Sequence, residues 1–332
     1  MSKTVLVTGG AGYIGSHVVR QLGESGYDIV VLDNLSSGFA DAITYGELIV
    51  GDTGNMELVS GIMAKYDINA VMHFAAHTIV PESVTDPLKY YWNNTCSSRN
   101  LLQCCKNQGV KKFIFSSTAA VYGMPANGKA TEDTPVAPMA PYGSSKLMTE
   151  WMLRDLSNAG DINYVALRYF NVAGSDPQSR IGQSTPNATL LIKVACEAAV
   201  GNRPSVSIFG TDYETPDGTG VRDFIHVEDL AAAHIKALEY LDSGKKSTVL
   251  NCGYGHGYSV RQVLEMVEKL HGTKLTIHEE PRRDGDIPAL TAVADKIHTV
   301  LGWQPKYDNL EFIIQTSLDW EKKLARGEAY KR

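Results

Sequence analysis

Short apolar runs alternate with segments of helical periodicity through the first half of this chain. In order, the runs read "KTVLVTG", "DIVVLD", "ELIVGD", "AVMHFA", "KKFIFSS" and "NYVALRYF". A run that is apolar at every position is typical of a strand buried on both faces, and strands that alternate with helices pair in parallel. The pattern therefore predicts an α/β fold with a doubly wound parallel sheet, an architecture that often binds nucleotides.

Helices are predicted between these strands, where apolar residues recur with helical spacing. The predicted helices cover residues 14–24, 56–65, 86–106 and 142–158. The third begins at Asp86-Pro87, an N-cap followed by proline at the first helical position.

The rhythm changes after Asn171, where turn-rich stretches such as "AGSDPQSRIGQSTPN" and "FGTDYETPDGTG" predict loops. Residues 1–170 are expected to form the Rossmann domain, to which residues 225–252 return through the strand "TVLNCG". Residues 171–332 are expected to form a smaller, loop-rich α/β domain over the carboxyl ends of the strands. Its predicted helices, together with one in the returning segment, cover residues 190–200, 228–241, 260–271, 295–301 and 310–324.

Composition is that of an ordinary globular protein, with 332 residues, 43% hydrophobic and 20% charged. The net charge of −6 argues against a nucleic-acid-binding surface, so an anionic ligand must be held by local arginines and backbone amides. Five cysteines without a C-x-x-C pair predict free thiols in a reducing compartment. The first apolar run is broken at once by glycines, which is typical of a strand and not of a signal peptide, and no segment is long enough to span a membrane. We therefore expect a cytoplasmic protein.

A glycine loop, "TGGAGYIG", stands between the first strand and the first helix. Gly9, Gly12 and Gly15 allow a tight turn and the close approach of a pyrophosphate to the helix N-terminus, whose amides favour anions. Asp33 ends the second strand about twenty residues further on, where a carboxylate accepts ribose hydroxyls and repels the extra phosphate of NADP. The cofactor predicted here is therefore NAD, although a helix cap is the plain alternative for Asp33.

Two further residues near Asp33 are candidates for the adenosine end. Asn34 is expected to assist Asp33, and Asp52, which ends the third strand, is a candidate partner for the adenine amino group. A simple loop aspartate is the alternative for Asp52.

Tyr142 and Lys146 lie four residues apart directly after Pro141, so a helix places both side chains on one face. An ammonium beside a phenol favours the phenolate, which can act as a base. The spacing arises often by chance, and an exposed pair on a helix is the default interpretation for an isolated motif.

Several motifs, taken with the glycine loop, resemble the extended short-chain dehydrogenase/reductase family, and within it the UDP-sugar 4-epimerases. They read "FIFSSTAAVYG", "PYGSSK", "RYFNVAG", "DGTGVRDFIHVEDL" and "PRRDGDIPA", and with the loop they run in order from residue 4 to about residue 305. The resemblance implies an NAD-dependent isomerase that interconverts UDP-glucose and UDP-galactose. C4 of the sugar is oxidised, the 4-keto intermediate rotates, and the hydride returns to the other face.

Catalytic roles follow from the resemblance. Tyr142 is implied as the acid/base, Lys146 as the residue that holds the nicotinamide ribose and lowers the pKa of Tyr142, and Thr118 as a partner of the reacting hydroxyl. Bringing a phenol from a pKa of about 10 to neutrality takes about 4 kcal/mol, for which Lys146 and the positive nicotinamide are the expected source. The cofactor-binding residues implied are Gly9, Gly12, Tyr13, Ile14, Gly15, Asp33, Asn34, Ser37, Asp52, Thr53, Phe74, Ala75, Ala76, Asn93, Ser116, Tyr142, Lys146 and Tyr169.

The UDP end is implied in the same way. Arg222 and Arg283 match a diphosphate clamp, because a guanidinium suits phosphate oxygens; a surface salt bridge is the alternative for either alone. The resemblance makes Asp286 the ribose partner, Phe209 the uracil neighbour and Asn171 the amide facing the sugar or β-phosphate. The substrate-binding residues expected in all are Thr118, Tyr142, Phe170, Asn171, Leu190, Phe209, Arg222, Arg283, Asp286 and Leu290.

Three positions depart from the pattern of well-known bacterial members. Thr78 replaces a lysine that contacts the cofactor, and Leu190 replaces an asparagine or histidine near the phosphate. Leu290 replaces a tyrosine associated with restriction to glucose and galactose. Because leucine is shorter and has no hydroxyl, we expect a lower, drier wall beside the C2 substituent, and hence activity on the 2-acetamido sugars UDP-N-acetylglucosamine and UDP-N-acetylgalactosamine. Another side chain filling the space is the alternative.

The residues within these motifs also bear on other reactions of nucleotide sugars. Ala119 and Ala120 follow Thr118 where related dehydratases carry Asp-Glu, so dehydration is disfavoured. The rival interpretations are a net NAD-dependent sugar dehydrogenase, a 4-epimerase of UDP-pentoses or UDP-glucuronate, and a non-catalytic NAD-binding regulator.

Two expectations concern partners and metals. Tyr90, Tyr91 and Trp92 lie on a helix whose apolar stripe packs against a second subunit in this family, so a homodimer is expected, although burial inside one chain gives the same pattern. No metal site is expected, because the histidines, among them His73 and His226, lack metal-ligand spacing.

Overall fold

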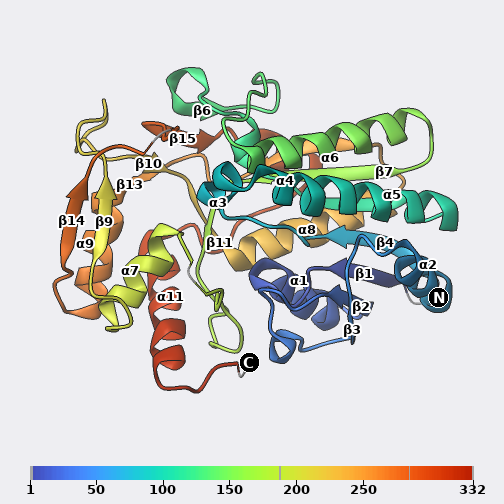
Figure 1. Ribbon diagram of the computed structural model, residues 1–332, viewed down its shortest axis with the longest axis horizontal. Coiled ribbons are helices and arrows are strands. Elements are labelled where there is room, and N and C mark those ends of the chain that lie inside the picture. Colours follow the sequence, from blue (N-terminus) through green and yellow to red (C-terminus); the bar gives the residue numbers. More distant parts are fainter. Residues whose placement is uncertain (1–2, 187, 284, 331–332) are drawn as a thin grey trace.

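A parallel sheet of seven strands forms the larger part of the molecule (Figure 1). The structure is a computed structural model that describes residues 3–186, 188–283 and 285–330. The strand order is β12-β7-β5-β4-β1-β2-β3, and every neighbouring pair in it is parallel. The predicted doubly wound fold is therefore confirmed. The strands are β1 (Thr4–Thr8), β2 (Asp28–Asp33), β3 (Glu47–Val50), β4 (Ile68–His73), β5 (Lys112–Ser116), β7 (Asn163–Tyr169) and β12 (Thr248–Cys252).

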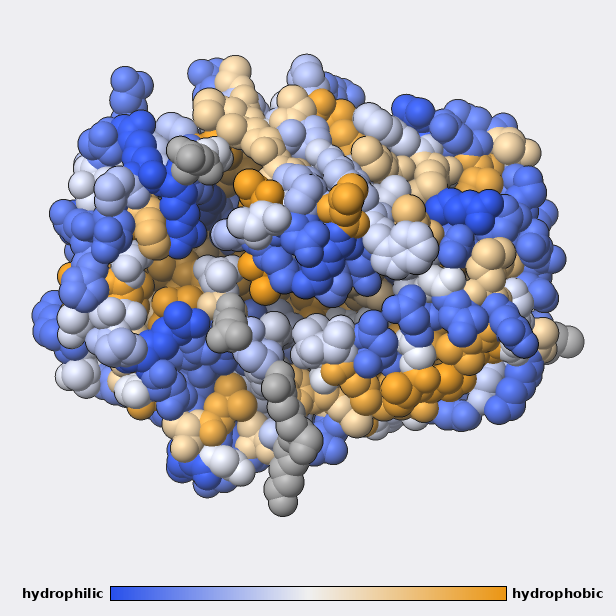
Figure 2. Space-filling view, viewed as in Figure 1, coloured by the Kyte–Doolittle hydropathy of each residue, from blue (hydrophilic) through white to orange (hydrophobic). Residues whose placement is uncertain are grey.

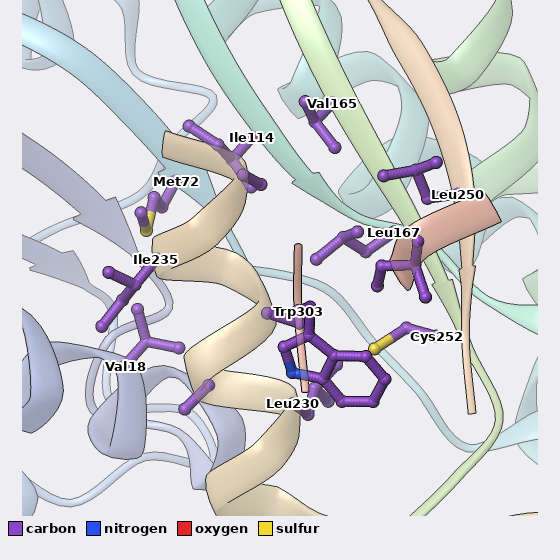
Figure 3. Packing of buried hydrophobic residues seen from close by; sticks show 14 of the residues in the cluster. Val18, Met72, Ile114, Val165, Leu167, Leu230, Ile235, Leu250, Cys252 and Trp303 are labelled. Carbon is purple, nitrogen blue, oxygen red and sulfur yellow. The ribbon is translucent and has the colours of Figure 1, made fainter. Parts of the chain in front are cut away.

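Both faces of the sheet are covered, as the continuous apolar runs predict. Val5 and Val7 of β1 pack into a core with α1 (Tyr13–Glu24) and α8 (Val227–Asp242). Leu6 points to the other face and packs with helices that complete the opposite layer. Figure 3 shows the first core, where Trp303 lies against Cys252 and α8. The opposite layer consists of α2 (Met56–Tyr66), α5 (Ser97–Gln108) and α6 (Pro141–Asn158).

The predicted helix over residues 86–106 is present, but it changes its winding midway. It begins as α4 (Pro87–Tyr90), continues as a π-helical turn over Tyr91–Cys96 and then becomes α5. Asn94, buried in the π turn, donates to the carbonyl of His77 and accepts from the amide of the same residue. The wider winding therefore brings the amide of Asn94 to the loop that follows β4.

The remaining part of the chain packs α7 (Leu191–Ala199), α9 (Val260–His271) and α11 (Leu310–Ala325) around a third core. Its sheets are short, which is why the apolar pattern did not predict them. The strands that sequence analysis missed are β6 (Lys129–Ala130), β8 (Asn171–Ala173), β9 (Val206–Phe209), β10 (Val221–Arg222), β11 (Phe224–His226), β13 (Tyr258–Ser259), β14 (Ile277–Glu280) and β15 (Ala289–Ala292); α3 (Val80–Thr85) was missed as well, and α10 (Asp295–Leu301) was predicted.

The four-stranded sheet has the order β13-β10-β15-β6 and joins segments far apart in the sequence. β6 belongs to the first half of the chain, whereas β10, β13 and β15 belong to the second. The division at residue 170 stays a prediction. Within the described residues, every helix is too short or too polar to span a lipid bilayer.

Candidate active site

A cavity of about 910 Å³ lies at the carboxyl edge of the main sheet. The loops after β1, β2, β4 and β5 line one side, and residues from β10 and β15 line the other. Figure 2 shows the surface hollowed between the two parts of the molecule. Every predicted cofactor- and substrate-binding residue lines this cavity except Lys146 and Phe209.

The glycine loop is shaped by contacts that leave no room for side chains. Gly9 has a φ of +70°, and a Cβ there would lie 2.5 Å from the amide nitrogen of Ala75. A Cβ on Gly15 would lie 2.2 Å from the carbonyl oxygen of Gly9. Gly12 is the N-cap of α1, and no side chain caps the first turn of that helix. The first amides of α1 are therefore not taken by a side-chain cap and suit an anion.

Two carboxylates at the sheet edge are oriented by backbone amides. Asp33 accepts hydrogen bonds from the amides of Ala11 at 2.9 Å and Leu35 at 2.8 Å, and burial raises its pKa. Asp52 accepts from the amide of Gly54 at 2.7 Å and from Nδ2 of Asn34 at 3.3 Å. The three residues predicted to surround the adenosine end, Asp33, Asn34 and Asp52, thus line the cavity, as does Ser37, which was predicted to bind the cofactor.

Helix α6 carries the Tyr142–Lys146 pair, and both side chains are buried. Nζ of Lys146 donates to the carbonyl oxygen of Ser116 at 2.9 Å, which ties α6 to the end of β5. Burial lowers the pKa of Lys146 to about 7. Tyr142, unlike Lys146, lines the cavity, together with Thr118 and Tyr169.

The chain's own groups do not by themselves lower the pKa of Tyr142, so the expected lowering by Lys146 together with the positive nicotinamide stays a prediction. Burial, followed by the neighbouring Tyr169, raises the pKa of Tyr142, while a hydrogen bond with Thr118 acts in the opposite direction. Lys146 gives little help because a buried amine with a pKa near 7 is only partly charged at neutral pH. The acid/base role of Tyr142 stays a prediction, and its physical basis in this chain must include more than Lys146.

The other end of the cavity holds two guanidinium groups. Nη2 of Arg222 pairs with Oδ1 of Asp286 at 3.3 Å, and burial lowers the pKa of Arg222. The guanidinium carbon of Arg283 lies 3.5 Å from the ring centroid of Phe209. Phe209, expected beside a uracil, thus lies beneath an arginine instead of on the cavity wall.

Leu290 and Arg222 are direct partners in the parallel pairing of β15 with β10. Asp223, next in the chain, is fully buried and accepts hydrogen bonds from the amides of Tyr254, Gly255 and Ala292. These bonds fix β10 against its neighbours. The positions of Leu290 and of Arg222 are therefore linked through one short sheet.

The other positions that depart from the family pattern also line the cavity. Leu190 is the N-cap of α7 and is 37% exposed, and Thr78 is exposed in the loop after β4. Asn171 begins β8 and, like Phe170 before it, lines the same wall.

Sequence analysis missed a rim of the cavity. It consists of one face of α3, with Val80 and Val84 exposed, and four residues between β8 and α7, which are Gln183, Thr185, Ala188 and Thr189. Neither has a sequence motif. α3 follows β4 of the main sheet and the other residues follow β8, so only their position in the fold could have identified them.

The described residues contain no group of three or more His, Cys, Asp or Glu side chains arranged to hold a metal ion. His73 illustrates why a histidine here is structural. Its ring nitrogens hydrogen-bond to Thr8 at 2.6 Å and Ser98 at 2.8 Å, and burial lowers its pKa to about 3.

Comparison with known proteins agrees with this geometry. The sequence model of the NAD dependent epimerase/dehydratase family matches residues 5–253. A UDP-glucose 4-epimerase of Azospirillum brasilense is 53% identical over 98% of this chain and 94% of its own length. A UDP-glucose 4-epimerase from Brucella ovis, solved in complex with NAD, is 41% identical with a TM-score of 0.93 over 96% of this chain and 98% of that chain. The UDP-Glc/GlcNAc 4-epimerase from Campylobacter jejuni is 47% identical with a TM-score of 0.86 over 97% and 100%. From its sequence and its fold, this chain belongs to the NAD dependent epimerase/dehydratase family.

Proposed function

We propose that this chain interconverts UDP-glucose and UDP-galactose at C4 of the sugar, with NAD as its resident cofactor. One observation carries the proposal: Thr118, Tyr142 and Tyr169 meet on the wall of a single cavity that has the glycine loop at one end and Arg222 at the other. The named relatives act as UDP-glucose 4-epimerases, and together with the cavity they support the same reaction here.

The glycine loop fits NAD by its own geometry. The close approach of Gly9 to Ala75 and the uncapped first turn of α1 suit a pyrophosphate, and the carboxylate of Asp33 suits a ribose without a 2′-phosphate. Bound there, NAD supplies a reversible hydride acceptor, so no net oxidation results.

The chain's own residues supply the proton transfer and the positioning. We assign to Tyr142 the removal of the proton from the C4 hydroxyl and its later return, and to Thr118 a hydrogen bond that orients this hydroxyl. Lys146, whose Nζ donates to the carbonyl oxygen of Ser116, is assigned the role of orienting the nicotinamide ribose. Arg222 and Arg283 hold the diphosphate while the 4-keto sugar rotates to present its other face to the cofactor.

The cavity disfavours related reactions. Ala119 and Ala120, which follow Thr118, line it and carry no acid or base for dehydration. Among the described lining residues the carboxylates are Asp33, Asp52 and Asp286, all at the two ends. None of the five cysteines, all of them in the described part of the chain, lines the cavity, which disfavours a second oxidation through a thiol.

Acceptance of the 2-acetamido sugars is a second element of the proposal. Leu290 lines the cavity, and its side chain is only partly buried against the main core. A leucine there presents no hydroxyl to the C2 substituent. The relative from Campylobacter jejuni, which acts on both kinds of sugar, supports this reading.

We also propose that two copies of the chain form a dimer through α4, the π-helical turn that follows it and α6. Leu88 is 77% exposed and Trp92 71% exposed, and Trp151 on the adjacent α6 is 44% exposed. Tyr90, expected in the same apolar stripe, is instead completely buried and donates to the carbonyl of Ile79. The proposed contact surface is therefore Leu88, Trp92 and Trp151. The free cysteines support work in a reducing compartment, which we take to be the cytoplasm.

The first prediction concerns turnover. Purified protein incubated with UDP-galactose and no added cofactor is expected to form UDP-glucose, detected by proton NMR. Tyr142→Phe should lower kcat by about 10²- to 10⁴-fold because the acid/base is lost, whereas Tyr66→Phe should match the native chain. No conversion by a native chain that carries NAD would contradict the proposal and point to another UDP-sugar or to a regulator.

The second prediction concerns the cofactor. Gly9→Ala should remove bound NAD from the purified protein, because a Cβ 2.5 Å from the nitrogen of Ala75 cannot be accommodated. Gly61→Ala, with nothing within 4 Å of the new Cβ, should retain it. The nucleotide released on denaturation measures both. Equal NAD content in the two variants would refute the assignment of the loop.

The third prediction concerns sugar selectivity. The native chain is expected to convert UDP-N-acetylgalactosamine as well as UDP-galactose. Leu290→Tyr should lower kcat/KM for the acetamido sugar by about 10- to 200-fold and leave that for UDP-galactose nearly unchanged. A native chain that converts UDP-galactose alone would reject the open-wall interpretation.

The fourth prediction concerns assembly. Sedimentation velocity should show a dimer, and Trp92→Asp with Leu88→Asp should give a monomer because charges replace the apolar contact. Met124→Asp, at a position 60% exposed elsewhere, should remain dimeric. A monomeric native chain would overturn the proposed contact.

A further inference from the structure

A buried ion pair lies behind the part of the cavity wall formed by Thr118, Tyr142 and Tyr169, which we call the catalytic wall. Glu150 on α6 accepts hydrogen bonds from Nε of Arg168 at 3.0 Å and from its Nη2 at 2.6 Å. The two residues are 4% and 6% exposed, so the pair is removed from water. Oε1 of Glu150 also accepts a hydrogen bond from Oγ of Ser117.

Each member of this cluster is adjacent to a residue of the catalytic wall. Glu150 follows Tyr142 and Lys146 on one buried face of α6, at intervals of four residues. Arg168 directly precedes Tyr169 at the end of β7. In extended backbone successive side chains point to opposite sides, so a group that holds residue 168 orients residue 169 on the other side.

Ser117 has the same relation to the end of β5. The carbonyl of Ser116 accepts from Lys146, and Thr118 lines the cavity. Ser117 stands between them with its side chain fully buried and bonded to Glu150. One carboxylate therefore holds α6, β5 and β7 at a single point.

Arg168 also packs against an aromatic ring on the side away from Glu150. The guanidinium carbon of Arg168 lies 4.9 Å from the ring centroid of Tyr122, whose hydroxyl donates to Asn251 at 2.6 Å. Nη1 of Arg168 is buried and has no hydrogen-bond partner among the described residues. Among the described residues, Glu150 is thus the only carboxylate that hydrogen-bonds to this cation.

We propose that Glu150 and Arg168 are positioning residues for the C4 chemistry, setting the spacing of Tyr142, Thr118 and Tyr169 without touching the sugar. The inference rests on the proposed function. It assigns to the pair an effect on kcat and little effect on KM, because the groups that hold the UDP, Arg222 and Arg283, share no contact with the cluster.

The test is steady-state kinetics of Glu150→Gln with UDP-galactose. The amide keeps the shape and one acceptor but weakens the hold on Arg168 and Ser117. We expect kcat to fall about ten- to a hundredfold, as a misplacement of about 1 Å produces, with KM within about threefold of native.

A matched control separates positioning from stability. Glu321 on α11 forms a buried ion pair with Lys193 of α7, away from the catalytic wall. Glu321→Gln makes the same chemical change in another core, and we expect it to lower the melting temperature but leave kcat near native. Bound NAD, released on denaturation, should be equal in both variants.

Ser117→Ala keeps the test decisive if Glu150→Gln fails to fold. It removes one hydroxyl from the cluster, and we expect a smaller fall in kcat with KM unchanged. Native kcat in a folded Glu150→Gln, or in Ser117→Ala when that variant has to replace it, would overturn the inference, as would a kcat loss matched by Glu321→Gln. An inactive native chain would instead contradict the proposed function.

Discussion

The buried polar face of α6 is the constraint on which the rest of the site depends. A phenol, an amine and a carboxylate lie at successive turns of one helix, and each must find a partner once it is removed from water. The partners come from the ends of β5 and β7. Once these three side chains are hydrogen-bonded, α6 can neither slide along its axis nor rotate about it, so Tyr142 has one available position. The central wall of the cavity is thus a consequence of ordinary hydrogen-bond satisfaction in a dry interface.

The two ends of the cavity are built by different physics. At the cofactor end, geometry is local, because Gly9, Gly12 and Gly15 shape a loop within a few residues and Asp33 is held by nearby amides. At the other end, Arg222 depends on segments distant in the sequence, since β10 pairs with β13 and β15. Asp223 accepts hydrogen bonds from the amide of Ala292 in β15 and from that of Tyr254, which precedes β13. The first end is encoded in a motif, whereas the second exists only when the chain is folded.

This difference explains what the sequence could predict. The strands of the main sheet and the long helices were predicted because their apolar patterns are continuous, and the glycine loop because its spacing is diagnostic. The short strands around Arg222 carry no periodicity, as they are two to four residues long and half buried. The effect of burial on the pKa values of Tyr142 and Lys146 was not predicted, because sequence spacing reveals a neighbouring amine but not its loss of water.

The pairing of Arg222 with Leu290 has a consequence for how such an enzyme diversifies. Leu290, which we propose borders the sugar, and Arg222, which we propose holds the phosphate, stand opposite each other in a sheet pinned by Asp223. A substitution at position 290 that moved the backbone of β15 would also move β10 and the guanidinium of Arg222, whereas a side chain that fits without moving the backbone leaves Arg222 in place. The substitutions at position 290 that persist in a lineage are therefore expected to be those that keep the register of this short sheet.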